Sequence, residues 1–156
     1  MKIEFWSVGK TNEAYIEPGV AEFTRRISKY YKCEWKIISL PKNTGKLNPA
    51  ELKKKEAEKI LSLLKKEDYL VVLDQRGNQL TSEGVADFIK SRANESIKSL
   101  IFVIGGSYGL DKEVLARAKF QWSFSNLTFP HQLVRLILSE QVYRACTIIK
   151  NEKYHH

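Results

Sequence analysis

"LIFVIGGSYGLDKEV", residues 100–114, passes from an apolar run into a glycine turn and then into a helical segment. Five apolar residues lead directly to the pair Gly105-Gly106, and a third glycine follows at Gly109. This order is typical of a buried strand that ends in a tight connection. Glycine also permits a positive φ and a close approach of a ligand to the backbone. A plain turn and a ligand-binding loop both explain these residues.

The known phosphate-binding glycine loops do not match this turn. A dinucleotide fingerprint has the form G-x-G-x-x-G after the first strand, whereas the pattern here is G-G-x-x-G after the fourth predicted strand. A Walker loop needs G-K-[ST], which the turn lacks. A different nucleotide-using α/β enzyme, with phosphate bound at Gly105–Gly109, stays open as an alternative.

Strands and helices alternate along the rest of the chain, which predicts an α/β fold with a parallel sheet. The segment 68–74 is nearly all apolar, as expected for a strand that is covered on both faces. Turns are expected at 9–12 and 75–82, and a mobile basic loop at 41–49. Thr81 or Ser82 is expected to cap the third helix. The predicted strands are 2–8, 33–40, 68–74, 99–106 and 119–125, and the predicted helices begin near 18, 50, 82, 111 and 130.

Length and composition indicate one soluble domain. The 156 residues are 43% hydrophobic and 28% charged, which is ordinary for a globular protein. No apolar run approaches the roughly 20 residues of a membrane span, and the N-terminus lacks the features of a signal peptide. We therefore expect a cytoplasmic protein with no membrane partner.

The formal net charge of +8 favours an anionic partner, with nucleic acid first, although some basic proteins are merely soluble. The run Lys53–Lys55 is expected to form a solvated helix face, with contact to RNA backbone as the weaker alternative. Cys33 and Cys146 lack metal-ligand spacing and are expected to be reduced, packed thiols. No metal site is predicted.

Three predicted strand ends carry polar residues or glycine: "VVLDQRG" (71–77), "FVIGGSYG" (102–109) and "SFSNLTFPH" (123–131). Ligands of parallel sheets lie beyond the carboxyl ends of strands. The third segment alternates Ser, Asn and Thr with apolar residues, which suits an adenine-bearing ligand, although an ordinary loop entering a helix explains it too. Arg76 either contacts RNA phosphate or is solvated.

The last helix has unusual faces. His131 and Arg135 lie four residues apart on one face, and Glu140 and Arg144 lie four apart on nearly the opposite face. Apolar residues fill both flanks between them, so one flank is expected to face the core and the other a second subunit. Glu140 and Arg144 also suit a simple surface ion pair, and His131 suits a helix N-terminal residue bonded to backbone.

The segments "VIGGSYGL", "SFSNLTFPHQLVRLILSEQVYRA" and the terminal "YH" resemble the bacterial RlmH family, as do the N-terminal "VGK" and the "LD…G" strand end. The resemblance covers the whole chain. It implies a single SPOUT-class methyltransferase domain over 1–156, with a C-terminal trefoil knot and cofactor-binding part at about 68–156. It also implies a homodimer that uses S-adenosylmethionine to methylate N3 of a pseudouridine in 23S rRNA. The lack of a separate RNA-binding module suggests the assembled ribosome as substrate.

The same resemblance implies the site residues. Arg144, Tyr154 and His155 are the expected catalytic residues, with His131 and Glu140 as further candidates, because the N3 proton must be removed. His156 is set aside, since a terminal His-His pair is also typical of a tag. The expected cofactor-binding residues are Leu73, Gly105, Phe124, Ser125, Asn126, Leu127, Thr128 and Phe129. A non-catalytic ribosome-binding or RNA-binding factor, and a SPOUT methyltransferase with another RNA target, remain as alternatives.

Overall fold

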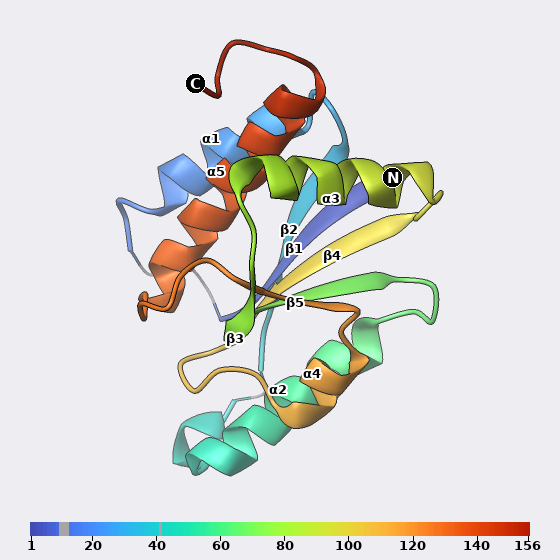
Figure 1. The fold of residues 1–156 in the computed structure, drawn as a ribbon. Helices are drawn as coiled ribbons and strands as arrows, with labels where there is room; N and C mark the ends of the chain where they lie inside the picture. Colours follow the sequence, from blue (N-terminus) through green and yellow to red (C-terminus); the bar gives the residue numbers. More distant parts are fainter. Residues whose placement is uncertain (10–12, 41) are drawn as a thin grey trace.

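The computed structural model describes residues 1–9, 13–40 and 42–156. Over these residues the chain forms a five-stranded parallel sheet with five α-helices and one 3-10 turn. Figure 1 shows how the sheet and the helices are arranged. The α/β fold with a parallel sheet is therefore confirmed. The strands are β1 Lys2–Val8, β2 Lys32–Ile38, β3 Tyr69–Gln79, β4 Ser99–Ile104 and β5 Phe120–Ser123. The helices are α1 Glu17–Ile27, η1 Thr44–Lys46, α2 Pro49–Leu63, α3 Ser82–Asn94, α4 Lys112–Arg117 and α5 His131–Ile149.

The strand order is β2-β1-β4-β3-β5, so β4 lies at the centre of the sheet. Phe102 on β4 is in register with Phe5 on β1 and with Val71 on β3. All residues of β4 after Ser99 are buried, because helices cover both faces of the sheet. The glycine turn at 105–106 therefore begins at the carboxyl end of the central strand.

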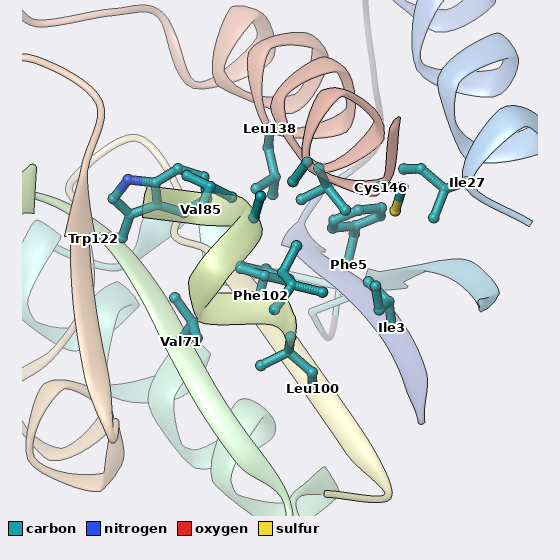
Figure 2. Packing of buried hydrophobic residues seen from close by; sticks show 14 of the residues in the cluster. Ile3, Phe5, Ile27, Val71, Val85, Leu100, Phe102, Trp122, Leu138 and Cys146 are labelled. Carbon is teal, nitrogen blue, oxygen red and sulfur yellow. The ribbon is translucent and has the colours of Figure 1, made fainter. Parts of the chain in front are cut away.

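The two faces of the sheet have separate cores. Helices α1, α3 and α5 cover one face, where Phe5, Phe102 and Leu138 are fully buried between sheet and helices (Figure 2). Helices α2 and α4 cover the other face, where Ile60 and Val103 are buried. Figure 1 shows this three-layer arrangement. Alternate residues along each strand face opposite layers, as the pleat requires.

Local sequence signals explain where the helices begin. The side chain of Asn48 accepts from the backbone N–H of Glu51, and Glu51 accepts from the N–H of Asn48, which forms a capping box at α2. Thr81 Oγ1 accepts from the N–H of Gly84, which confirms the predicted cap of α3. Asp111 caps α4 in the same way through the N–H of Glu113.

The largest error in the predicted elements concerns the expected turn at 75–82. Strand β3 instead continues to Gln79, with a register shift against β5 between Leu73 and Asn78. A Cβ on Gly77 would lie 2.6 Å from the carbonyl carbon and oxygen of Gln121, so glycine is needed where the bulged strand presses on β5. The glycine and polar residues that suggested a turn at 75–82 instead mark this bulge. The sequence alone does not distinguish a bulge from a reversal of the chain.

The other predicted boundaries differ by about two residues at strand and helix ends. Within the loop expected at 41–49, residues 44–46 form the turn η1 and residue 49 begins α2; residue 41 lies outside the described residues. The turn expected at 9–12 is described only at its first residue. None of the helices in the described residues is long and apolar enough to cross a membrane.

Candidate functional site

A cavity of about 620 Å³ lies at the carboxyl ends of β3, β4 and β5. Its wall includes the ends of these strands, the loops that follow them, and the first turn of α5 at His131 and Val134. This is where the topology of a parallel sheet leaves room for a ligand. A cavity of this size is within the range of small-molecule sites.

Seven of the eight residues predicted to bind a cofactor line this cavity. Asn126 is the exception: it is absent from the wall, and its Oδ1 accepts a hydrogen bond of 3.1 Å from Nε2 of Gln79 on β3. The seven residues that line the cavity are Leu73, Gly105, Phe124, Ser125, Leu127, Thr128 and Phe129.

Hydrogen bonds shape the loop between β5 and α5. Ser123 Oγ donates to the carbonyl oxygen of Ser125 at 3.0 Å, and Ser125 Oγ accepts from the N–H of Leu127 at 3.0 Å. Thr128 Oγ1 donates to Oε1 of Gln75 at 3.3 Å, which ties this loop to β3. The Ser and Thr residues that suggested a ligand loop therefore also hold the loop in place.

Trp122 adds an aromatic wall that the sequence motifs did not indicate. Its ring packs edge-on against Phe124, with centroids 4.7 Å apart, and both residues line the cavity. Its indole N–H is buried and has no hydrogen-bond partner in the described part of the chain. Buried donors of this kind are normally bonded, so a bound molecule with an acceptor atom would suit this wall.

The glycine turn has a different physical basis from the expected one. A positive φ, which glycine permits, is found at Gly109 (+77°) but not at Gly105 or Gly106. A Cβ on Gly105 would lie 3.0 Å from the carbonyl carbon of Gly109 and from the Leu110 side chain. The N–H of Gly109 donates to the carbonyl oxygen of Gly106 at 3.0 Å. Close packing within the turn therefore explains the glycine at 105.

Charged residues border the cavity on one side. Arg76 donates to both carboxylate oxygens of Asp74, each at 3.0 Å, and this pairing holds the pKa of Asp74 below its usual value. Lys53 on α2 also lines the cavity. Within the run predicted to be a solvated face, Lys53 is half-buried and borders the cavity beside the glycine loop, whereas Lys54 and Lys55 are exposed.

His131 is the one predicted catalytic residue in the cavity wall. Burial and the nearby Arg135 guanidinium lower the pKa of its imidazole, which keeps the ring neutral at pH 7. Arg135 itself is only 1% exposed and donates hydrogen bonds to the carbonyl oxygens of Val8 and Gly9. On this face of α5, His131 therefore lies at the cavity and Arg135 connects the helix to the end of β1.

The other four predicted catalytic residues form a separate cluster, hereafter the tail cluster: Glu140, Arg144, Tyr154 and His155. Oε1 of Glu140 accepts from Arg144 Nη2 at 2.6 Å and from the hydroxyl of Tyr154 at 3.1 Å. The guanidinium of Arg144 stacks on the Tyr154 ring, 4.8 Å from its centroid. Nη1 of Arg144 lies 3.4 Å from Nδ1 of His155. The ion pair of Glu140 and Arg144 is therefore part of a larger network.

Contacts within the tail cluster raise the pKa values of two of its members. Burial, followed by the charge of Glu140, raises the pKa of the Tyr154 phenol, so it is protonated at neutral pH. Hydrogen bonding to Glu140 raises the pKa of Arg144. Glu140 is held further by Gln141, whose Nε2 donates to Oε2 at 2.7 Å. The cluster therefore presents a fixed cation and a hydroxyl donor.

The tail cluster lies far from the cavity of its own chain. Arg144 follows His131 by thirteen residues on the same helix, which separates them by about 20 Å at about 1.5 Å per residue. None of the four tail-cluster residues belongs to the cavity wall in the described chain. One chain therefore carries two halves of the predicted site at opposite ends of α5.

Comparison with known proteins assigns the chain to one enzyme family. The family model described as "Predicted SPOUT methyltransferase" matches residues 1–155. The chain belongs to the SPOUT methyltransferase family. In this SPOUT methyltransferase, no group of three or more His, Cys, Asp or Glu side chains is placed to hold a metal ion, as far as the described residues extend.

Curated relatives of this SPOUT methyltransferase match over its full length. It is 46% identical to the ribosomal RNA large subunit methyltransferase H of Cytophaga hutchinsonii, over 100% of both chains. It is 44% identical to the protein of the same name from Christiangramia forsetii, over 100% of this chain and 99% of the relative. A third relative of that name, from Acetivibrio thermocellus, is 44% identical over 99% of both chains.

Proposed function

We propose that this protein is an rRNA methyltransferase that uses S-adenosylmethionine to methylate N3 of a pseudouridine in 23S rRNA on the assembled ribosome. The observation that carries the proposal is the cavity, which collects seven predicted cofactor residues in a chain of the SPOUT methyltransferase family. The names of the full-length relatives support large-subunit rRNA as the substrate. An enzyme of this kind acts in the cytoplasm, where ribosomes are found.

The cavity wall suits S-adenosylmethionine. Aromatic and aliphatic side chains such as Phe124 and Leu73 can enclose a purine ring, and the Ser and Thr hydroxyls with loop amides can read its edge. The carboxylate of Asp74 is kept ionised by Arg76 and lies in the wall, where it can pair with a cationic part of the ligand. In the proposed fold, residues at about 68–156 form the knotted cofactor-binding part.

When bound, the cofactor supplies a methyl group that is already activated by the sulfonium, so the protein must orient the acceptor nitrogen and remove its proton. The neutral imidazole of His131 lies in the wall of the cavity and is able to accept a proton. Arg144 supplies a cation for negative charge that develops on the flanking carbonyl oxygens. His155 is the second candidate base, and Tyr154 a hydrogen-bond donor.

These roles require two chains, since Arg144 lies about 20 Å along α5 from His131 and no tail-cluster residue lines the cavity of its own chain as far as the structure describes it. In the proposed homodimer, the tail cluster of each protomer completes the cavity of its partner. Helix α5 offers a surface for this contact: Leu133 and Ile137 are only half-buried and lie outside both cores of the described chain. In the proposed homodimer a second copy buries these two side chains, which explains why apolar residues occupy both flanks of α5.

Mixed dimers test this arrangement. Leu73→Arg blocks the cavity, and His155→Ala removes the tail-cluster imidazole, so each homodimer is expected to be inactive. Random mixing makes half of the dimers heterodimers, each with one intact site, which restores about a quarter of the wild-type activity. If the mixture is as inactive as either variant alone, the shared site is wrong.

The decisive experiment is methyl transfer from radiolabelled S-adenosylmethionine. Bacterial 70S ribosomes that lack the modification, isolated 50S subunits and naked 23S transcript are compared as substrates, and the labelled nucleotide is mapped by mass spectrometry. Label on N3 of a 23S pseudouridine, with the fastest transfer on 70S ribosomes, is the expected result. Cofactor binding with label elsewhere would change the target. Ribosome binding without cofactor binding would instead favour a non-catalytic ribosome-associated factor.

A further inference from the structure

We propose that Glu56 on α2 is a positioning residue of the cofactor cavity, whose carboxylate holds the Gly105-Gly106 turn in the shape that receives the methyl donor. This inference rests on the proposed function, since it assigns a role within the proposed S-adenosylmethionine site. Neither the motifs of the sequence nor the resemblance to a family points to Glu56. The residue belongs to a different element from the three strand ends that form the cavity.

Glu56 carries a carboxylate on the buried, otherwise apolar face of α2. Its residue is only 5% exposed, on the same buried face of α2 as Ala57 and Ile60. Removing a carboxylate from water costs several kcal/mol unless partners compensate it. Burial accordingly raises the pKa of Glu56, while the N–H of Gly106 and the charge of Lys53 act in the opposite direction. The partners that stabilise this buried anion are thus a cavity turn and a cavity lysine.

The contact with Gly106 is unusually close. A Cβ on Gly106 would lie 2.5 Å from Oε1 and 3.0 Å from Oε2 of Glu56, so the carboxylate occupies the space of a side chain. The nearby Gly106 N–H favours the charged form of that carboxylate. The glycine at 106, which needs no positive φ, is therefore explained by Glu56. Any larger residue at 106 would have to displace the carboxylate from its backbone donor.

The contact between Glu56 and Gly106 bears directly on the shape of the cavity wall. The carbonyl oxygen of Gly106 accepts from the N–H of Gly109, which closes the turn, and Gly105, Gly106 and Gly109 all line the cavity. Lys53 lies three residues before Glu56 on the same helix, its charge acts to lower the pKa of both Glu56 and Asp74, and it also lines the cavity. Helix α2 therefore supports the glycine turn from behind and places a cation beside it.

The test compares Glu56→Met with Glu56→Gln. Methionine keeps the length of the side chain but does not replace the carboxylate as acceptor, whereas the glutamine amide oxygen still accepts from the Gly106 N–H. Titration calorimetry with S-adenosylmethionine is expected to show a Kd about tenfold higher for Glu56→Met and within about threefold of wild type for Glu56→Gln. Glu58→Met is the matched control, because Glu58 lies on the exposed face of α2.

Steady-state kinetics separate positioning from general damage. For Glu56→Met the KM for S-adenosylmethionine is expected to rise about tenfold, with the KM for ribosomes unchanged. Equal losses toward both substrates, or a Glu56→Gln variant as weak as Glu56→Met, would overturn the inference and leave Glu56 a residue of the core. Wild-type protein that binds no S-adenosylmethionine would overturn the proposed function itself, and the cofactor role of Glu56 with it.

A double-mutant cycle covers the case in which Glu56→Met does not fold. Gly106→Ala pushes the carboxylate aside, and Glu56→Ala vacates the space into which the new Cβ projects. The two changes are therefore expected to be non-additive, with Glu56→Ala/Gly106→Ala binding S-adenosylmethionine no more weakly than Glu56→Ala alone. Additive losses would show that the two residues act independently and would contradict the inference.

Discussion

Nη1 of Arg144 lies 3.4 Å from Nδ1 of His155, and this contact fixes the tautomer of the neutral imidazole. Arginine has only donors, so Nδ1 must be the acceptor. Nε2 then carries the hydrogen and donates it to Oε1 of Glu83 at 2.8 Å. In the neutral form of the ring, the lone pair of His155 is thus turned toward Arg144. For His155 to act as a base, the substrate must open this contact.

Removal of the His155 side chain tests its assignment as a base. We expect His155→Ala to lower kcat for methyl transfer by about 10²–10⁴-fold, the usual contribution of a positioned acid or base. Binding of S-adenosylmethionine, measured by calorimetry, should stay the same because the residues expected to enclose the cofactor all come from the cavity of one chain and do not include His155. His156→Ala is the adjacent control. If kcat is unchanged in single-turnover measurements, the base lies elsewhere, with His131 the next candidate.

The acid–base behaviour of His131 is open to direct measurement. Burial and the charge of Arg135 lower the pKa of His131, so NMR titration of the folded protein should give a value below its ordinary 6.5. In urea the value should return to about 6.5. Because the unfolded chain then takes up the proton first, this residue makes folding less favourable as pH falls below about 6.5. A folded-state pKa above 6.5 would contradict the described environment.

The bulge of β3 predicts that alanine substitutions at two glycines have very different effects on the free energy of unfolding. Gly77→Ala would place a Cβ 2.6 Å from the Gln121 carbonyl, so the free energy of unfolding should fall by about 1–3 kcal/mol or more. Gly45→Ala, in η1, has no heavy atom within 4 Å of the added Cβ and should change it by less than about 0.5 kcal/mol. Urea denaturation of both variants measures the difference, and equal stabilities would mean that β3 and β5 do not pack as described.

The two cysteines should be chemically silent in the folded protein. Burial raises the pKa of both Cys33 and Cys146 to about 12, so neither forms a thiolate at pH 8. A thiol reagent is expected to react with both only after unfolding in urea. The sign of the pH effect follows: between about pH 9 and 12 the unfolded thiols lose protons first, so stability should fall as pH rises. Fast reaction of native protein at pH 8 would contradict this.

The sequence predicts the parallel α/β fold well because its strands are short apolar runs and its helices have clear start signals. Thr81 is a good example, since its cap depends only on local residues. The cavity is predictable for a similar reason: the carboxyl ends of parallel strands share one edge, whatever the details of packing. The motifs at these strand ends predict a ligand site at this edge, and of the eight cofactor-binding residues that the family resemblance implies, seven line the cavity.

Contacts between distant elements are beyond the reach of local patterns. The periodicity of α2 marks Ala57 and Ile60 as buried, but nothing local indicates that Glu56 meets Gly106, fifty residues later. The position of Lys53 at the cavity is missed for the same reason, because a lysine run looks the same whether or not one member borders a cavity. The separation of the tail cluster from the cavity also depends on the length and direction of α5, which only the assembled fold reveals.

The placement of His131 and Arg144 at opposite ends of α5 gives the proposed enzyme a dependence on its own concentration. A single folded chain would bind the methyl donor and still have no complete site. On dilution, activity per chain should therefore fall in proportion to the dissociation of the pair, while cofactor binding per chain persists. A cell that makes little of the protein would lose modification more steeply than it loses protein, because active sites form by association of two chains.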